Sequence, residues 1–207
     1  MAELLIDGPE TSALTVALAH GAGAPMDSPF MAFFAAGLAA AGWRVVRFEF
    51  PYMQATREDG MRRPPDRTDV LMKVWHGVIA DLGPGRLIIG GKSLGGRIAS
   101  MVADRLGVRG VVCLGYPFHP PGKADRLRTE HLATLATPTL IIQGTRDEFG
   151  NRDEVAGYPL SPAIRLHWIE EGDHGFRPRA ASGRTDEQSR DEALGRLLAF
   201  LDERRAD

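Results

Sequence analysis

The chain has 207 residues, of which 43% are hydrophobic and 25% charged, and its formal net charge is -2. This length favours one compact domain over residues 1–207. A charge so close to neutral gives no reason to expect nucleic acid or an anionic membrane as a partner. No basic, apolar leader opens the sequence, and its longest apolar run is shorter than the roughly 18 residues of a membrane span. We therefore expect a cytoplasmic protein.

Short apolar runs alternate with amphipathic stretches along the chain. The opening segment, Glu3–Asp7, is expected to form an antiparallel edge strand. The remaining expected strands are Leu14–Ala19, Arg44–Phe50, Arg86–Ile89, Val111–Leu114, Thr139–Ile142 and Ile164–Ile169. The expected helices are Met31–Ala41, Arg67–Asp81, one that starts at Ser93, and Ala193–Arg204, and two long loops are expected over Pro51–Asp66 and Glu171–Asp186. This alternation predicts an α/β fold: a mostly parallel sheet of about seven strands with helices on both faces.

The most specific motif is Gly91-Lys92-Ser93-Leu94-Gly95, a G-x-S-x-G pattern in which an apolar strand runs directly into an amphipathic helix. The residues two before and two after the serine must be small, because strand and helix pass close together at such a turn. A helix that starts here also directs free backbone N–H groups at the reaction centre, where they favour an oxyanion. The pattern predicts Ser93 as a nucleophile and Leu94 N–H as an oxyanion donor.

Two other interpretations of this segment are open. Gly91-Lys92-Ser93 also matches the end of a phosphate-binding P-loop. That motif needs a glycine where the chain has Arg86, and an apolar strand occupies the place of its flexible loop. A glycine-rich turn with Ser93 as a helix cap would also account for a serine at this position. Whether Ser93 is a cap or a nucleophile therefore depends on whether the chain supplies a base and an acid for it.

Two partners for the serine follow later strands. A serine hydroxyl needs a base, and the base needs an orienting acid. Asp147 lies a short turn beyond one expected strand, and His174 lies in the equivalent place beyond the next. Serine, acid, histidine is the order of an α/β-hydrolase triad. We therefore predict Ser93, His174 and Asp147 as nucleophile, base and acid, with Glu148 as the alternative acid and Asp173 as a turn-shaping residue.

The loop after the first parallel strand consists of small residues, His20-Gly21-Ala22-Gly23-Ala24. Small residues let the backbone approach a substrate carbonyl, so we expect a second oxyanion N–H from Ala22 or, alternatively, Gly23. His20 is expected to fix this loop.

The remaining histidines and the one cysteine form no metal-binding pattern. There is no C-x-x-C or H-E-x-x-H motif, so we expect neither a metal nor a cofactor. Cys113 is expected to be a buried strand residue rather than a reactive thiol. His76, His131 and His167 are interpreted as helix-surface or strand residues.

With these motifs in place, the chain resembles the α/β-hydrolase superfamily over nearly its whole length. It is similar to a small cap-less serine hydrolase group, related to dienelactone-hydrolase-like proteins and to hydrolase-like proteins of chromatin complexes. The segments that carry this resemblance are H-G-A-G-A-P-M-D-S-P-F-M, F-E-F-P-Y-M, R-R-P-P-D-R, G-K-S-L-G-G-R and L-G-Y-P-F-H-P-P-G-K. The resemblance implies the triad Ser93, Asp147 and His174, with Ala22 and Leu94 as oxyanion donors. Dienelactone hydrolases proper use a cysteine nucleophile, so the resemblance does not carry over their specific activity.

The connection over 115–138 is too short for a separate cap domain, so we expect an open pocket. Its walls are expected to come from side chains at strand ends, with ordinary core packing as the alternative for each: Phe30, Phe34, Tyr52, Met53, Phe118 and His119. Four arginines could recognise an anionic substrate or belong to a solvated loop, and we favour the loop: Arg57, Arg62, Arg63 and Arg67.

These assignments favour a serine hydrolase that cleaves a small-molecule carboxylic ester or thioester through an acyl-enzyme. The alternative is a non-catalytic protein of the same fold that binds a protein partner. Acyl transfer or perhydrolysis by the same triad is a third hypothesis.

Overall fold

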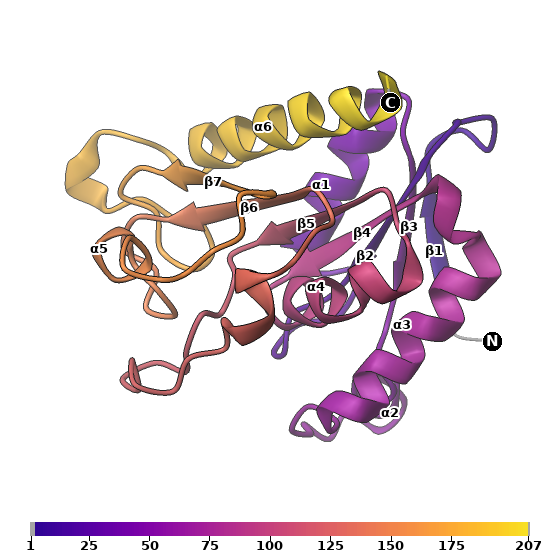
Figure 1. Cartoon of the computed structure of the whole chain (residues 1–207), viewed down its shortest axis with the longest axis horizontal. Coiled ribbons are helices and arrows are strands. Elements are labelled where there is room, and N and C mark those ends of the chain that lie inside the picture. The colour runs from indigo at the N-terminus through magenta and orange to yellow at the C-terminus, as the bar shows by residue number, and fades with distance from the viewer. Residues whose placement is uncertain (1–2, 207) are drawn as a thin grey trace.

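The computed structural model describes residues 3–206. Seven strands form one sheet in the order β1-β3-β2-β4-β5-β6-β7 (Figure 1). Every neighbouring pair is parallel except β1 and β3, which are antiparallel. The strands are β1 (Leu4–Asp7), β2 (Thr15–Ala19), β3 (Arg44–Phe48), β4 (Leu87–Lys92), β5 (Gly110–Leu114), β6 (Thr139–Gly144) and β7 (Ile164–Ile169). The predicted mostly parallel sheet and its antiparallel edge strand are confirmed.

Helices cover both faces of this sheet (Figure 1). Helices α1 (Pro29–Ala40) and α6 (Asp186–Ala206) pack on one face, and α3 (Thr68–Leu82) and α4 (Leu94–Leu106) pack on the other. Since both faces are covered, the central strands are apolar throughout rather than alternating: every residue of β2 and of β5 is buried.

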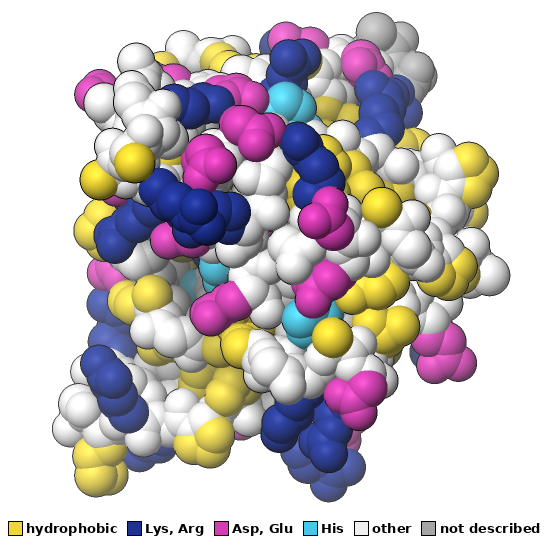
Figure 2. Space-filling view, turned by 90° about the vertical axis from the view of Figure 1, so that its left-hand side faces the viewer, with side chains coloured by type: hydrophobic (Ala, Val, Ile, Leu, Met, Phe, Trp, Pro, Cys, Tyr) yellow, Lys and Arg dark blue, Asp and Glu magenta, His cyan; other side chains and the backbone are white. Residues whose placement is uncertain are grey.

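The carboxyl ends of the parallel strands meet at one edge of the sheet, on the left in Figure 1. Figure 2 faces that edge and shows acidic and basic side chains interspersed around histidine side chains. Loops at this edge of an open α/β sheet are where such folds bind ligands.

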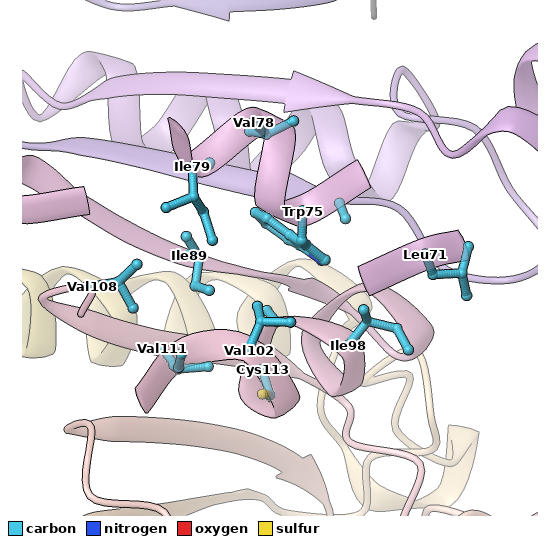
Figure 3. Packing of buried hydrophobic residues seen from close by; sticks show 14 of the residues in the cluster. Leu71, Trp75, Val78, Ile79, Ile89, Ile98, Val102, Val108, Val111 and Cys113 are labelled. Carbon is cyan, nitrogen blue, oxygen red and sulfur yellow. The ribbon is translucent and has the colours of Figure 1, made fainter. Parts of the chain in front are cut away.

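The core between α3, α4 and the sheet is shown in Figure 3. Trp75 of α3 points toward Ile89 of β4 and toward the α4 side chains Ile98 and Val102. Cys113 of β5 belongs to the same cluster, and burial raises the pKa of its thiol well above its usual range. The expectation of a buried cysteine is confirmed.

The expected loop over 51–66 is wrong in its first half, where the chain forms helix α2 (Pro51–Asp59). Pro51 is pre-set for the first helical turn, and Gly60 ends the helix in the left-handed conformation, with a φ of 74°. Only Tyr52 and Met53 are buried, so the helix has too short an apolar face for a periodic pattern to indicate it.

Helix α6 begins at Asp186, where the sequence predicted a start at Ala193. Thr185 and Gln188 form a reciprocal pair at its beginning. The Gln188 N–H donates to Thr185 Oγ1 at 3.1 Å, and the Thr185 N–H donates to Gln188 Oε1 at 3.0 Å. This capping box stabilises a first turn that carries no apolar face.

The connection between β5 and β6 contains turns and the 3₁₀ helix η2 (Glu130–Ala133), which agrees with the prediction of a fold without a cap domain. Other short elements are η1 (Pro84–Arg86), α5 (Arg152–Val155) and η3 (Ala180–Ser182). None of the helices within residues 3–206 has the length and apolar character needed to cross a membrane.

Candidate active site

Ser93 lies at the turn between β4 and α4, with a φ of 49° and a ψ of -110°. This backbone conformation is costly for a residue with a side chain, by about 1–3 kcal/mol, and persists only where neighbours enforce it. The Ser93 N–H donates to the Leu114 carbonyl at 3.1 Å, and the Ser93 carbonyl accepts from Arg97 N–H at 3.0 Å. The turn brings Ser93 into the lining of a cavity of about 570 Å³.

The two motif glycines let α4 and β4 approach the end of β2. A Cβ atom on Gly91 would lie 2.0 Å from the Ala19 carbonyl oxygen, and one on Gly95 would lie 2.3 Å from the same atom. Both distances are far below van der Waals contact with a backbone atom that cannot move aside. The expectation of small residues on both sides of the serine agrees with this packing.

Replacing Gly95 with alanine is therefore expected to destabilise the protein by about 3 kcal/mol, since the methyl group would overpack a backbone contact. Urea unfolding measures the change. The matched control is Gly195→Ala in α6, where a Cβ would meet nothing within 4 Å. That control should be neutral or stabilising by up to about 1 kcal/mol. Equal stability of the two variants would contradict the close approach.

Asp147 and His174 are joined directly: His174 Nδ1 lies 2.7 Å from Asp147 Oδ2. Asp147 is fully buried and accepts two further bonds, from Gln143 Nε2 at 2.9 Å and from Phe149 N–H at 2.9 Å. A buried carboxylate that only accepts hydrogen bonds assigns the proton to Nδ1 and leaves Nε2 free to take another proton. Glu148, the alternative acid, is exposed to solvent.

Gln143 is a supporting residue that the sequence analysis missed. Besides its contact with Asp147, Nε2 lies 3.1 Å from each of the carbonyl oxygens of Tyr116 and Gly150, so its two N–H groups are shared among three acceptors, and Oε1 accepts from Tyr116 N–H at 2.6 Å. The side chain thus connects the turn after β5 to the turn that carries Asp147. Its sequence signal is a long polar side chain near the end of a strand whose centre is apolar.

Replacing Gln143 with methionine keeps the volume but removes these bonds. We expect a loss of about 3 kcal/mol in the free energy of unfolding, because buried groups of Tyr116 and Asp147 lose partners. Chemical denaturation measures it, with Gln54→Met as control, since Gln54 makes one longer, partly exposed bond of 3.3 Å. Similar losses in both variants would show that the Gln143 network does not stabilise the turn.

The turn that carries His174 is shaped by Asp173 and fixed against the Asp147 turn. Asp173 Oδ1 accepts from Gly175 N–H at 2.7 Å and from Arg177 N–H at 2.9 Å, as expected of a turn-shaping residue. A Cβ on Gly144, at the end of β6, would lie 2.3 Å from the Gly172 carbonyl oxygen. The backbones of the two turns are therefore in direct contact, and the Arg146 N–H also donates to the Gly172 carbonyl at 2.9 Å.

Burial lowers the pKa of His174, the hydrogen bond with Asp147 opposes this, and the nearby Lys92 ammonium lowers it further. The net shift is downward from the ordinary histidine value. This downward shift favours the neutral imidazole, which is the state a general base requires.

The small-residue loop after β2 lines the same cavity, with Ala22 and Gly23 on its surface. His20 is fully buried beneath it. Its Nδ1 lies 2.6 Å from the Gly21 carbonyl and its Nε2 accepts from Phe50 N–H at 3.1 Å, which agrees with a role in fixing the loop. Directly after Ser93, Leu94 opens α4, and the first N–H groups of a helix have no acceptor within it.

Two of the pocket candidates reach a cavity. Phe30 lines the cavity that contains Ser93, and Met53 lines a second cavity of about 340 Å³ that shares Ala22 and Gly23 with the first. Tyr52 is 4% exposed, and its hydroxyl lies 3.3 Å from the carbonyls of Gly21 and Ala22, so it supports the loop from beneath.

The structure places Phe34, Phe118 and His119 in the core rather than on either cavity. Phe34 is fully buried and packs on Phe30. Phe118 is also fully buried, because its ring packs between Tyr116 and Tyr158. His119 is 2% exposed, with Nε2 at 3.3 Å from Glu154 Oε2. The turn after β5 folds back into the core, which sequence position alone does not indicate.

Three of the four arginines form ion pairs. Arg57 contacts Asp27 and Glu49, Arg63 contacts Asp59, and Arg67 contacts Asp69. Arg57, Arg62 and Arg63 line the second cavity. Arg57 belongs to helix α2 rather than to the expected solvated loop, whereas Arg62 and Arg63 lie between α2 and α3 and Arg67 directly precedes α3. Within the described part of the chain, no group of three or more histidine, cysteine or acidic side chains is placed to hold a metal ion.

A family model described as an alpha/beta hydrolase domain matches residues 12–202. The chain belongs to the alpha/beta hydrolase family. Solved structures with the same fold as this alpha/beta hydrolase include a serine hydrolase homologue from Coxiella burnetii, at 22% identity and a TM-score of 0.69 over 94% of this chain and 90% of that one. Another is a serine hydrolase without a lid from Xanthomonas campestris, at 20% identity and a TM-score of 0.66 over 97% and 88%.

A third similar structure is the esterase domain of a Rhodothermus marinus protein, at 16% identity and a TM-score of 0.67, covering 97% of this chain and 91% of that one. At these identities the likeness concerns the fold alone.

Proposed function

We propose that this alpha/beta hydrolase cleaves a small-molecule carboxylic ester or thioester, with Ser93 as nucleophile, His174 as base and Asp147 as orienting acid. The observation that carries the proposal is the hydrogen bond between His174 Nδ1 and the buried Asp147, at a cavity that Ser93 also lines. Such a pair activates a serine hydroxyl, which is otherwise a weak nucleophile.

In the first half of the reaction, His174 Nε2 takes the proton of Ser93 Oγ while the oxygen attacks the substrate carbonyl carbon. The N–H groups of Leu94 and Ala22 stabilise the resulting oxyanion. The tetrahedral intermediate expels the alcohol or thiol, which receives the proton from His174 and leaves an acyl-serine. Water then attacks the acyl group by the same route, and the carboxylic acid departs.

The cavity suits a modest acyl or aryl group. Its volume of about 570 Å³ lies within the usual range of small-molecule sites, and the rings of Phe30 and Phe149 form part of its wall. The esterase domain among the similar structures supports ester cleavage, and another similar structure, Est1E from Butyrivibrio proteoclasticus, holds bound ferulic acid.

A fluorophosphonate probe tests the proposal directly. We expect one adduct, located on Ser93 by mass spectrometry, and its loss in His174→Ala because the alanine variant lacks the base. A panel of p-nitrophenyl esters of increasing chain length then sizes the acyl pocket. An unlabelled Ser93 in folded protein would overturn the proposal and favour a non-catalytic protein that binds a partner.

A further inference from the structure

Lys92, between Gly91 and the nucleophile, takes no part in the reaction described above, yet it contacts the turn that carries the base. Its Nζ donates a hydrogen bond to the backbone carbonyl of His174. The same ammonium lies 5.2 Å from the ring centroid of Phe30 and 5.7 Å from that of Phe176, within the range of cation–π attraction. Two segments far apart in the sequence, one with Phe30 and one with His174 and Phe176, thus contact one charged group.

Gly115, directly after β5, creates the space that this group occupies. A Cβ atom there would lie 2.6 Å from Lys92 Nζ and 2.9 Å from the His174 carbonyl oxygen. The backbone of Gly115 also has a φ of 72°, which a residue with a side chain rarely adopts. A glycine at this position therefore lets the lysine reach across β5 to His174.

The surroundings determine the charge of Lys92. Burial lowers the pKa of Lys92 to about 8, while Asp147 and Asp173 oppose the shift. The ammonium is thus largely retained at neutral pH and lost above pH 8. The charged groups facing this region or interacting with His174 are Lys92, Asp147, Glu148, Asp173, Arg177 and Arg190.

We propose that Lys92 is a positioning residue for His174, which ties the turn of the base to the turn of the nucleophile and keeps a positive charge beside the imidazole. The inference rests on the proposed function. The positive charge favours the neutral imidazole, and the hydrogen bond fixes the backbone from which the imidazole extends. One side chain therefore sets both the location of the base and the pH range in which it is competent.

Lys92→Met tests both roles, because it keeps an unbranched side chain one atom shorter and removes the charge and the donor. We expect kcat to fall roughly 10- to 100-fold with little change in KM, since a misplaced base affects the chemical step. We also expect the acid limb of kcat/KM to move up by about one pH unit, because a positive charge near His174 is gone.

Lys92→Arg separates the two roles. It keeps the positive charge, so the acid limb should stay near that of the wild-type protein. The planar guanidinium is wider than an ammonium and does not fit the space beside Gly115, so kcat should still fall. Lys73→Met, an exposed lysine of α3, is the matched control and should match the wild-type protein in both measurements.

A readout independent of turnover keeps this inference separate from the proposed function. The pKa of His174 is measured by NMR titration in the Ser93→Ala background, with and without Lys92→Met, and should rise by about one unit. If the wild-type protein hydrolyses no ester while this shift appears, the proposed function fails and the electrostatic role of Lys92 stands. An unchanged His174 pKa together with unchanged kcat overturns the inference. A rise in KM alone also overturns it, because Lys92 would then contact the substrate.

Discussion

Replacing Ser93 with alanine is expected to lower kcat for ester hydrolysis by roughly 10⁶-fold, the size of the loss found when the nucleophile of a serine triad is removed. Initial-rate assays with a p-nitrophenyl ester measure the loss. The alanine keeps the strained backbone of the turn, so the thermal midpoint should change little. Loss of activity without loss of stability would separate the chemical role of the hydroxyl from its contribution to the fold.

Ser100→Ala is the matched control for this prediction. Ser100 also has a histidine partner, with Oγ at 2.9 Å from His131 Nε2, but the serine is 2% exposed and lies on neither cavity near Ser93. The Ser100 variant should keep its rate and its fluorophosphonate adduct. Substantial hydrolysis by Ser93→Ala, or loss of the adduct on replacing Ser100, would refute the assignment of Ser93.

Replacing Asp147 with asparagine is expected to lower kcat by about 10⁴-fold with little effect on KM. The asparagine amide can donate to His174 Nδ1, which would favour the proton on Nε2 and remove the acceptor that the serine needs. The pH profile provides the measurement: activity should recover partly at alkaline pH, where serine and water deprotonate more readily without a base.

Glu148→Gln is the internal comparison, because it makes the same chemical change one residue further along the chain. Glu148 is exposed, so its rate should stay within about twofold of the wild-type rate, as expected for a solvent-screened charge. A larger loss in the Glu148 variant than in the Asp147 variant would reverse the choice of acid.

The sequence identifies the features that are local in the chain. The strand, turn and helix around Ser93 can be predicted because two glycines and an amphipathic helix lie within a few residues of the serine. Asp147 and His174 can be predicted because each follows an apolar strand at the same edge of the sheet. The sequence itself does not show that these turns meet. That conclusion follows from the parallel arrangement of the strands, which brings their carboxyl ends to one edge of the sheet.

Features that depend on tertiary contacts cannot be predicted from patterns in the sequence. The role of Gln143 depends on the turn after β5 lying beside Asp147. The bond from Lys92 to the His174 carbonyl depends on the space that Gly115 leaves. Phe118 was expected at the pocket because it follows a strand, but the turn after β5 returns it to the core. Short helix α2 was missed because two buried residues make no periodic pattern.

The absence of a cap between β5 and β6 has a kinetic meaning for the proposed enzyme. A hydrolase with a mobile cover must open before substrate enters, and a lipid surface can favour the open form. Here helix α1, which carries Phe30, and the turn that carries His174 line a cavity that no cap domain between β5 and β6 covers. The rate of ester hydrolysis by the proposed enzyme should therefore follow a simple saturation curve as ester concentration rises, without an increase when the ester begins to form micelles. Selectivity then depends on the few side chains of the cavity wall, and not on a gate.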